Sequence, residues 1–158
     1  RGIAEASDAD SMEKIKAMAL LVKAYMLYYI AWKNNHPNIP AWASYAMVDD
    51  ARIFQKYVGA WYEQTGKKWF EALWLVDGEV ISYKWILPIL PYFSCSAWFV
   101  FGGQEKRWWT DVPYLQWKLD VASCGDGTFQ WHGVWLSGRW AQQLAAKWAT
   151  YREILQYY

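Results

Sequence analysis

The sequence is poor in the residues that most often carry chemistry, with 2 His and 2 Cys among 158 residues. Neither these residues nor the scattered acids match the ligand spacing of a zinc site, so no metal is predicted. Nucleophile and phosphate-binding motifs are also missing: there is no G-x-S-x-G, no P-loop and no dinucleotide fingerprint. These absences predict no cofactor and favour a function other than catalysis.

An excess of charge of one sign is missing too. Lys and Arg number 16 against 15 Asp and Glu, and the basic residues occur singly or in pairs such as Lys67-Lys68 and Lys106-Arg107. Nucleic-acid binding needs a basic patch or stripe, so nucleic acid is not predicted as a partner. No repeat, low-complexity segment or linker interrupts the chain, and residues 1–158 are predicted to form a single domain.

Long hydrophobic runs are few. Ala17–Trp32 contains Lys23, and Trp85–Gly103 contains Pro88 and Pro91. A membrane-spanning helix needs about 20 mostly apolar residues, so a transmembrane span is not predicted, whereas peripheral contact with a membrane surface stays open. The sequence does not predict a cellular compartment.

The two cysteines, Cys95 and Cys124, allow one disulfide. Their spacing does not decide between a bridge and two buried thiols, which are ordinary packing residues. Both alternatives stay open.

Aromatic residues, by contrast, are abundant: 14 Trp, 12 Tyr and 6 Phe make up 20% of the chain. This is more than one core needs. Trp and Tyr combine an apolar body with a polar edge, which suits a pocket, a partner surface or a membrane interface. The surplus predicts binding of something bulky and apolar.

The N-terminal part has helical signals. Asp10 to Glu13 has the spacing of a capping box, and a helix is predicted from about Ser11 to Lys33, apolar almost all round after Ala17. Pro40 is well placed to start a second helix that runs to about Gln64.

The middle of the chain changes to a period typical of strands. Lys68–Leu87 is predicted to be a hairpin around Asp77-Gly78, the pair preferred in a type I′ turn. The resulting register pairs aromatic and charged side chains across the strands: Trp74 with Ile81, Phe70 with Trp85, and Glu71 with Lys84.

Four further strand segments follow. Ala97–Phe101 and Lys106–Val112 are predicted to form a second hairpin around Gly102-Gly103, and Thr128–Leu136 the last strand. Tyr114–Ser123 alternates between apolar and polar residues, as expected of a half-buried strand. Its covered face would carry Leu115, Trp117, Leu119 and Val121, and its wet face Gln116, Lys118 and Asp120.

The C-terminal residues from about Gly138 to Tyr158 are predicted to form one helix packed on the sheet. The predicted fold class is therefore α+β: two N-terminal helices, a curved antiparallel sheet of about six strands in three hairpins, and a C-terminal helix. In architecture alone this order resembles the cone-shaped ligand-binding folds of the nuclear-transport-factor type, whose implied feature is an aromatic-lined cavity. No functional residue is carried over from that resemblance.

Two titratable residues are candidates for acid–base chemistry. Asp50 falls among apolar residues of the predicted second helix, where burial would raise the pKa of a carboxyl group, and Lys23 is a candidate partner for it. Alternatively, Lys23 extends its ammonium group to water. His132 shares a strand face with apolar residues, and either a proton-transfer role or a structural hydrogen bond suits it.

The candidate binding residues are tryptophans: Trp85, Trp98, Trp108, Trp109, Trp117 and Trp131. Neighbouring strand residues face opposite ways, so Trp108 and Trp109 cannot both enter one core. With Lys106 and Arg107 beside them, they are predicted to form an exposed docking edge for a protein or a membrane surface.

Two functional hypotheses result. The first is a non-catalytic binding or assembly protein, an accessory subunit for example, whose aromatic pocket or interface holds a hydrophobic small molecule or a partner chain. The alternative is a small enzyme in which Asp50 or His132 transfers a proton to or from a hydrophobic substrate in an aromatic-lined cavity. Since such tryptophan enrichment is unusual, an engineered sequence is a third hypothesis.

Overall fold

The computed structural model of the chain describes residues 9–31, 39–48, 50, 66–107, 111–120, 124–125 and 132–158. Within these ranges it has four helices, α1 (Met12–Ala31), α3 (Lys67–Leu75), α4 (Gly138–Ala146) and α5 (Tyr151–Tyr157), and four two-residue strands, β1 (Tyr92–Phe93), β2 (Phe99–Val100), β3 (Lys118–Leu119) and β4 (Leu136–Ser137). The fold is mixed helix and strand, but the predicted curved sheet of six strands is wrong, and with it the likeness to cone-shaped folds.

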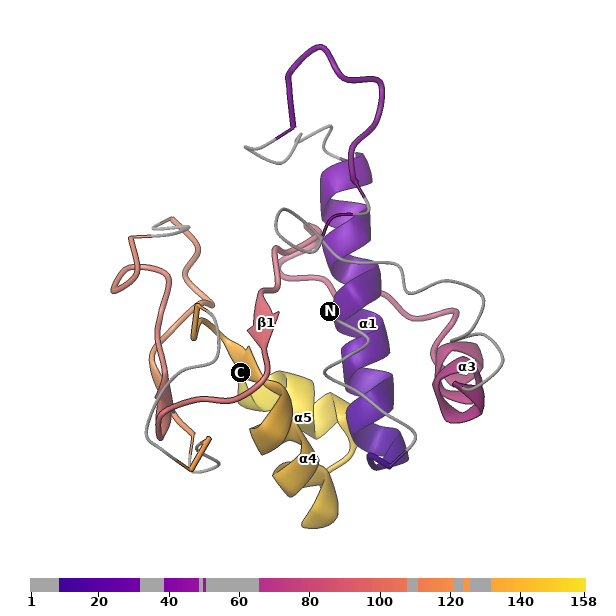
Figure 1. Cartoon of the computed structure of the whole chain (residues 1–158), viewed down its shortest axis with the longest axis vertical. Helices are drawn as coiled ribbons and strands as arrows, with labels where there is room; N and C mark the ends of the chain where they lie inside the picture. Colours follow the sequence, from indigo (N-terminus) through magenta and orange to yellow (C-terminus); the bar gives the residue numbers. More distant parts are fainter. Residues whose placement is uncertain are drawn as a thin grey trace.

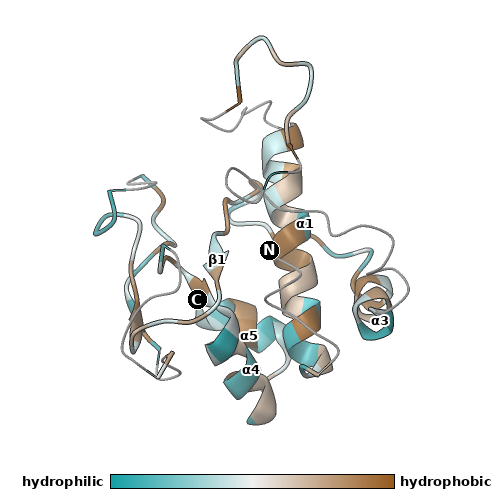
Figure 2. Cartoon of the chain, viewed as in Figure 1, coloured by the Kyte–Doolittle hydropathy of each residue, from teal (hydrophilic) through white to brown (hydrophobic). Residues whose placement is uncertain are grey.

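The first helix is confirmed, and α1 is the centre of the structure. It contacts α3, α4 and α5, and Figure 1 shows it lying between α3 and the region that contains the strands. Ile15, Met18 and Leu21 on this helix are 0% exposed. Figure 2 shows that the middle turns of α1 are predominantly apolar, whereas hydrophilic residues are prominent on α4 and α5.

The cap of α1 is not a local capping box, in which both hydrogen bonds form within the first turn of the helix. The Ser11 hydroxyl accepts from the backbone N–H of Lys14, as expected of an N-cap residue, with a distance of 3.2 Å. The reciprocal bond comes from far along the chain, because the Ser11 N–H donates to Oε1 of Gln142 on α4 at 3.0 Å. This cap therefore joins the two ends of the sequence.

The first predicted hairpin is wrong, because Lys67–Leu75 forms the helix α3. Trp69, Ala72 and Val76 recur every three to four residues and are buried, which is the period of a helix face and not of a strand. Asp77-Gly78 follows the helix as part of the turn that ends it, in which the Glu79 N–H donates to the Val76 carbonyl at 3.0 Å.

The second predicted helix is not seen at its start. Residues 39–48 contain no helix, and Pro40 instead begins a turn in which its carbonyl accepts from the Ala43 N–H at 2.9 Å. Helices in proteins are stabilised mainly by packing of an apolar face, and Trp42 in this turn is 84% exposed, without such packing. Residues 51–65 lie outside the described part of the chain.

The strands pair differently from the prediction. β2 pairs antiparallel with β3 instead of with Lys106–Val112, and β4 pairs parallel with β1. A parallel bridge between Phe101 and Val134 links the two small sheets. Gly102 permits the segment after β2 to lie close to the segment before β3, since a Cβ there would come within 2.8 Å of the Leu115 carbonyl.

The alternation predicted for Tyr114–Ser123 holds for Leu115 and Gln116 and is wrong from Trp117 onward. Leu115 is buried as expected, but Trp117 and Leu119 are 52% and 55% exposed, while Asp120 is 0% exposed. The cause is the register: Leu119 pairs with Phe99, whereas the neighbouring Val100 is the buried residue of β2. Val121 and most of the predicted sixth strand lie outside the described residues.

The predicted C-terminal helix is two helices, α4 and α5, separated at residues 147–150. Thr150 begins α5 with a complete capping box, in which its hydroxyl accepts from the Glu153 N–H and the Glu153 carboxylate accepts from the Thr150 N–H. The N–H of Tyr151 donates to Glu13 on α1 at 2.8 Å. The break therefore lets α5 pack against α1.

Cys95 and Cys124 form a disulfide, with their Cα atoms 5.4 Å apart. Among the described residues, no helix is long and apolar enough to cross a membrane.

Candidate functional site

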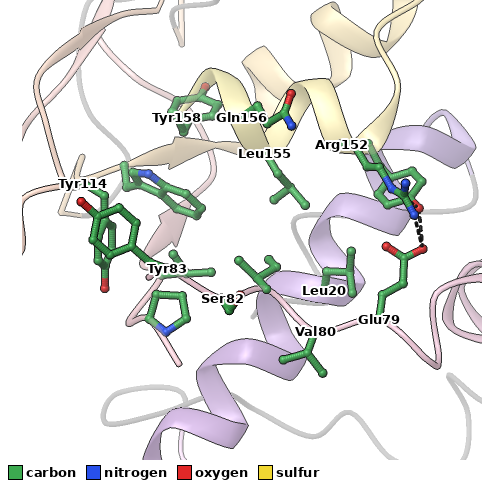
Figure 3. A pocket seen from close by; sticks show the side chains of 15 residues that line it. Leu20, Glu79, Val80, Ser82, Tyr83, Tyr114, Arg152, Leu155, Gln156 and Tyr158 are labelled. Atoms are coloured by element: carbon green, nitrogen blue, oxygen red, sulfur yellow. Dashed lines mark hydrogen bonds and ion pairs between the residues drawn. The ribbon is translucent and has the colours of Figure 1, made fainter. Parts of the chain in front are cut away.

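A pocket of about 390 Å³ lies where α1, α5 and the segment between residues 79 and 90 meet (Figure 3). Tyr114 and Trp135 complete its wall from the strand region. The volume is within the range of small-molecule sites, about 300–1,000 Å³. The lining residues are Leu20, Glu79, Val80, Ile81, Ser82, Tyr83, Pro88, Leu90, Tyr114, Trp135, Tyr151, Arg152, Leu155, Gln156 and Tyr158.

Paired aromatic rings form much of the wall. The rings of Tyr83 and Tyr114 have centroids 4.7 Å apart at 52°, and those of Trp135 and Tyr158 are 5.9 Å apart at 58°. Such pairs are stabilised beyond the burial of their area, so these rings hold one another in place. Leu155 on α5 faces the pocket between them and the polar end of the site (Figure 3).

A tight turn places Tyr83 in this wall. Lys84 and Trp85 both have positive φ, 49° and 69°, and Tyr83 and Ile86 exchange backbone hydrogen bonds of 3.0 and 3.1 Å across them. These are the features of a type I′ turn, which normally contains Asn and Gly. The turn leaves Trp85 98% exposed while Tyr83 lines the pocket.

The polar end of the pocket is a cluster of Glu79, Tyr151 and Arg152. The Tyr151 hydroxyl donates to Oε1 of Glu79 at 2.5 Å, and the Arg152 Nη2 lies 3.2 Å from the same oxygen. Nε of Arg152 donates to the Tyr151 hydroxyl at 2.9 Å. Glu79 and Arg152 thus lie side by side at the mouth, drawn with dashed lines in Figure 3.

These contacts set the protonation states of the cluster. The hydrogen bond from Tyr151 lowers the pKa of Glu79, which is therefore ionised at neutral pH. The same bond raises the pKa of Tyr151. Burial raises the pKa of Tyr114 to about 12. At neutral pH the pocket therefore offers the Glu79 carboxylate, the Arg152 guanidinium and the neutral phenol groups of Tyr114 and Tyr151.

Two further polar groups lie in the wall. The Tyr114 hydroxyl accepts from the backbone N–H of Ile89 at 2.9 Å, and a hydroxyl that accepts keeps its own proton for donation. The indole N–H of Trp135 is buried and has no acceptor among the described residues. The walls are thus predominantly apolar and contain a few fixed donors.

The tryptophans predicted as binding residues do not line this pocket. The exposed fractions of Trp85, Trp98 and Trp117 are 98%, 56% and 52%. Trp108, Trp109 and Trp131 lie outside the described residues, so the predicted docking edge at Trp108-Trp109 stays a prediction.

One exposed apolar surface does involve a predicted tryptophan. The β2–β3 register places Phe99, Phe101, Trp117 and Leu119 on one face of the pair, where the Phe99 and Trp117 rings stack at 6.2 Å. The Lys106 ammonium lies 4.0 Å from the centre of the Phe101 ring. This outer face of β2–β3 is separate from the pocket.

The two predicted acid–base residues are likewise absent from the pocket lining. His132 is held by the backbone on both ring nitrogens: Nδ1 accepts from the Val134 N–H at 3.0 Å, and Nε2 lies 3.1 Å from the Tyr92 carbonyl. Burial lowers its pKa to about 4, so the ring is neutral. This geometry matches the structural alternative for His132, since it joins the segment before β4 to β1.

Asp50 is partly buried and lies outside the described helices. Lys23, its candidate partner, instead donates to the Asp77 carbonyl, which follows α3. A catalytic role for Asp50 therefore stays a prediction that the pocket geometry does not support.

Sequence reasoning missed the tyrosines of the pocket. One signal was present: Tyr151, Leu155 and Tyr158 recur at helical spacing and all line it. Tyr83 and Tyr114 gave no such signal, because the contact between their rings depends on a turn and on a chain path that no local pattern specifies.

Similarity to known proteins gives no information about this site. No family model matches the chain, and no curated protein matches it significantly. Within the described residues, no three His, Cys, Asp or Glu side chains gather in a way that could hold a metal ion.

Proposed function

We propose that this chain is a non-catalytic binding protein that holds a small hydrophobic molecule in the pocket between α1, α5 and residues 79–90. The observation that carries the proposal is the wall of paired aromatic rings around about 390 Å³. Apolar walls with a few placed polar groups are typical of small-molecule sites.

The arrangement of the titratable groups supports binding over proton transfer. Glu79 is ionised and bonded to Tyr151 and Arg152, which makes it a weak base near neutral pH. The other candidates for acid–base chemistry, Asp50 and His132, do not line the pocket. A hydrophobic ligand would instead gain from burial against Tyr83, Leu155 and their neighbours, at roughly 25 cal/mol per Å² of apolar area.

The test is calorimetric titration of the whole chain with 2-phenylethanol, an uncharged aromatic probe. Tyr83→Ala removes one ring of the wall and is expected to weaken binding about tenfold, since deleting a buried aromatic contact removes one to a few kcal/mol. Trp117→Ala, an aromatic truncation on the outer face of β2–β3, is the matched control and should leave the affinity unchanged.

Two outcomes would contradict the proposal. Absence of binding by the unmodified chain would remove the pocket as a ligand site. Loss of binding in Trp117→Ala with full binding in Tyr83→Ala would move the site to the exposed aromatic face.

A further inference from the structure

The ion pair at the mouth of the pocket has unused bonding capacity. The side-chain contacts of Glu79 all fall on Oε1, which receives Tyr151 and Arg152. Its second oxygen, Oε2, is without a partner among the described residues, and the side chain is 33% exposed. One carboxylate oxygen is therefore open to a cation from solvent or from a ligand.

Arg152 has unused hydrogen-bond donors, where Glu79 has an unused acceptor. Its guanidinium carries five N–H donors, of which Nε engages Tyr151 and one Nη2 proton engages Glu79. Three donors remain, on a side chain that is 67% exposed. A planar guanidinium is well suited to a carboxylate, which it can bind through two parallel hydrogen bonds.

The two open groups lie next to each other, because Arg152 Nη2 and Glu79 Oε1 are 3.2 Å apart. Both residues also line the pocket whose walls are aromatic and aliphatic. An exposed ion pair contributes little to stability, so the pair can rearrange around a ligand at small cost. Figure 3 shows the pair at one end of the site, Tyr83 at the other and Leu155 between them.

We propose that the ligand is a small zwitterion with an apolar body, of the class of aromatic α-amino acids, whose ammonium group binds Glu79 and whose carboxylate binds Arg152. This inference rests on the proposed function and names its ligand class. An α-amino acid carries its ammonium and carboxylate groups on the same carbon atom, which matches the adjacent Glu79 and Arg152. Its side chain then fills the apolar space between Leu20, Leu155 and Tyr83.

The experiment compares four probes by calorimetric titration of the full chain. L-phenylalanine carries both charges, 2-phenylethylamine lacks the carboxylate, 3-phenylpropanoate lacks the ammonium group, and 2-phenylethanol is uncharged. L-phenylalanine is expected to bind at least tenfold more tightly than each of the others, because hydrogen bonds to charged groups are the stronger ones.

Variants assign each charge to its residue. Arg152→Gln should weaken L-phenylalanine about tenfold without weakening 2-phenylethylamine, and Glu79→Gln should weaken L-phenylalanine about tenfold without weakening 3-phenylpropanoate. Arg139→Gln, an exposed arginine of α4 outside the pocket lining, is the control and should change none of these affinities.

The outcomes separate the inference from the proposed function. If 2-phenylethanol or a singly charged probe binds as tightly as L-phenylalanine, the zwitterion inference is overturned while the hydrophobic pocket stands. If none of the four probes binds, both are overturned.

Discussion

Two regions of this molecule are stabilised in different ways. The helical region, formed by α1, α3, α4 and α5, is held by close packing of apolar side chains that lose all contact with water, such as Met18, Leu21 and Ile154. The strand region, residues 80–137, also buries apolar side chains in the same core, such as Val100, Val134 and Leu136. Its strands have only two residues each, and individual connections add to this packing. These are the Cys95–Cys124 disulfide, the His132 hydrogen bonds and a few backbone bridges.

The pocket lies where the two regions meet. Leu20, Tyr151 and Leu155 come from the helical region, whereas Tyr83 and Trp135 come from the strand region. The helical region supplies its wall through helix packing, whereas the opposite wall combines apolar packing with the disulfide and a few specific hydrogen bonds. Single changes should therefore act differently in the two regions.

Removal of a buried side chain in the helical region has the largest expected effect. Leu21→Ala is expected to lower the free energy of unfolding by about 2–5 kcal/mol, because it leaves a cavity beside α1. Ile30→Ala on the same helix is the control, with a change below about 0.5 kcal/mol, since Ile30 is 53% exposed. Urea denaturation measures both, and equal effects would contradict the packing described for α1.

Reduction of the disulfide tests the strand region. Cys95 and Cys124 are 29 residues apart, and opening a loop of this size is expected to lower the free energy of unfolding by about 3.5 kcal/mol. The double variant Cys95→Ser/Cys124→Ser, measured by urea denaturation, should reproduce the loss. A loss below about 1 kcal/mol would show that other contacts hold the strand region.

Acid should act on the strand region through His132. Its pKa is about 4 in the folded chain and 6.5 in the unfolded chain, because burial disfavours the charged ring. Between these values the unfolded state binds more protons, so stability falls as pH drops from 6.5 to 4. The loss amounts to about 3 kcal/mol.

The matched variant for this prediction is His132→Gln, which has no proton to gain. The difference in unfolding free energy between the two proteins should change with pH in this window and stay constant above it. A difference that is independent of pH would mean that His132 titrates equally in both states.

The smallest expected effect is a gain in stability at the turn that positions Tyr83. Trp85 has a φ of 69°, a backbone conformation that is strained for every residue except Gly. Trp85→Gly should therefore stabilise the chain by about 0.5–1 kcal/mol. The same change at Trp74, 82% exposed but within α3, should destabilise it by about 1 kcal/mol. Thermal unfolding distinguishes the two signs, and destabilisation by Trp85→Gly would contradict the turn.

The sequence predicted the helical region better than the strand region. Ser11 and the apolar residues after Ala17 correctly indicated α1, because a helix is specified by contacts within a few residues. The end of α4 was missed although Thr150 and Glu153 have the spacing of a capping box, since the apolar stripe continues across the break.

The strand region depended on contacts that local patterns do not encode. Asp77-Gly78 favoured a hairpin, but the helical spacing of Trp69, Ala72 and Val76 and their burial against the core prevailed. For β3, the pairing with β2 places Leu119 beside Phe99 on an exposed face, and the local alternation does not specify this pairing. The pocket shows the same difference: Tyr151 and Leu155 of α5 recur at helical spacing, whereas no local pattern brings Tyr83 and Tyr114 together.

Hydrogen exchange followed by mass spectrometry, with and without saturating 2-phenylethanol, tests the central claim that a ligand binds where the two regions meet. Binding in the pocket predicts slower exchange in residues 79–90 and 151–158 and no change in residues 98–103 and 115–119 of the outer face of β2–β3. Slower exchange confined to residues 98–103 and 115–119 would place the ligand on that face and contradict the account.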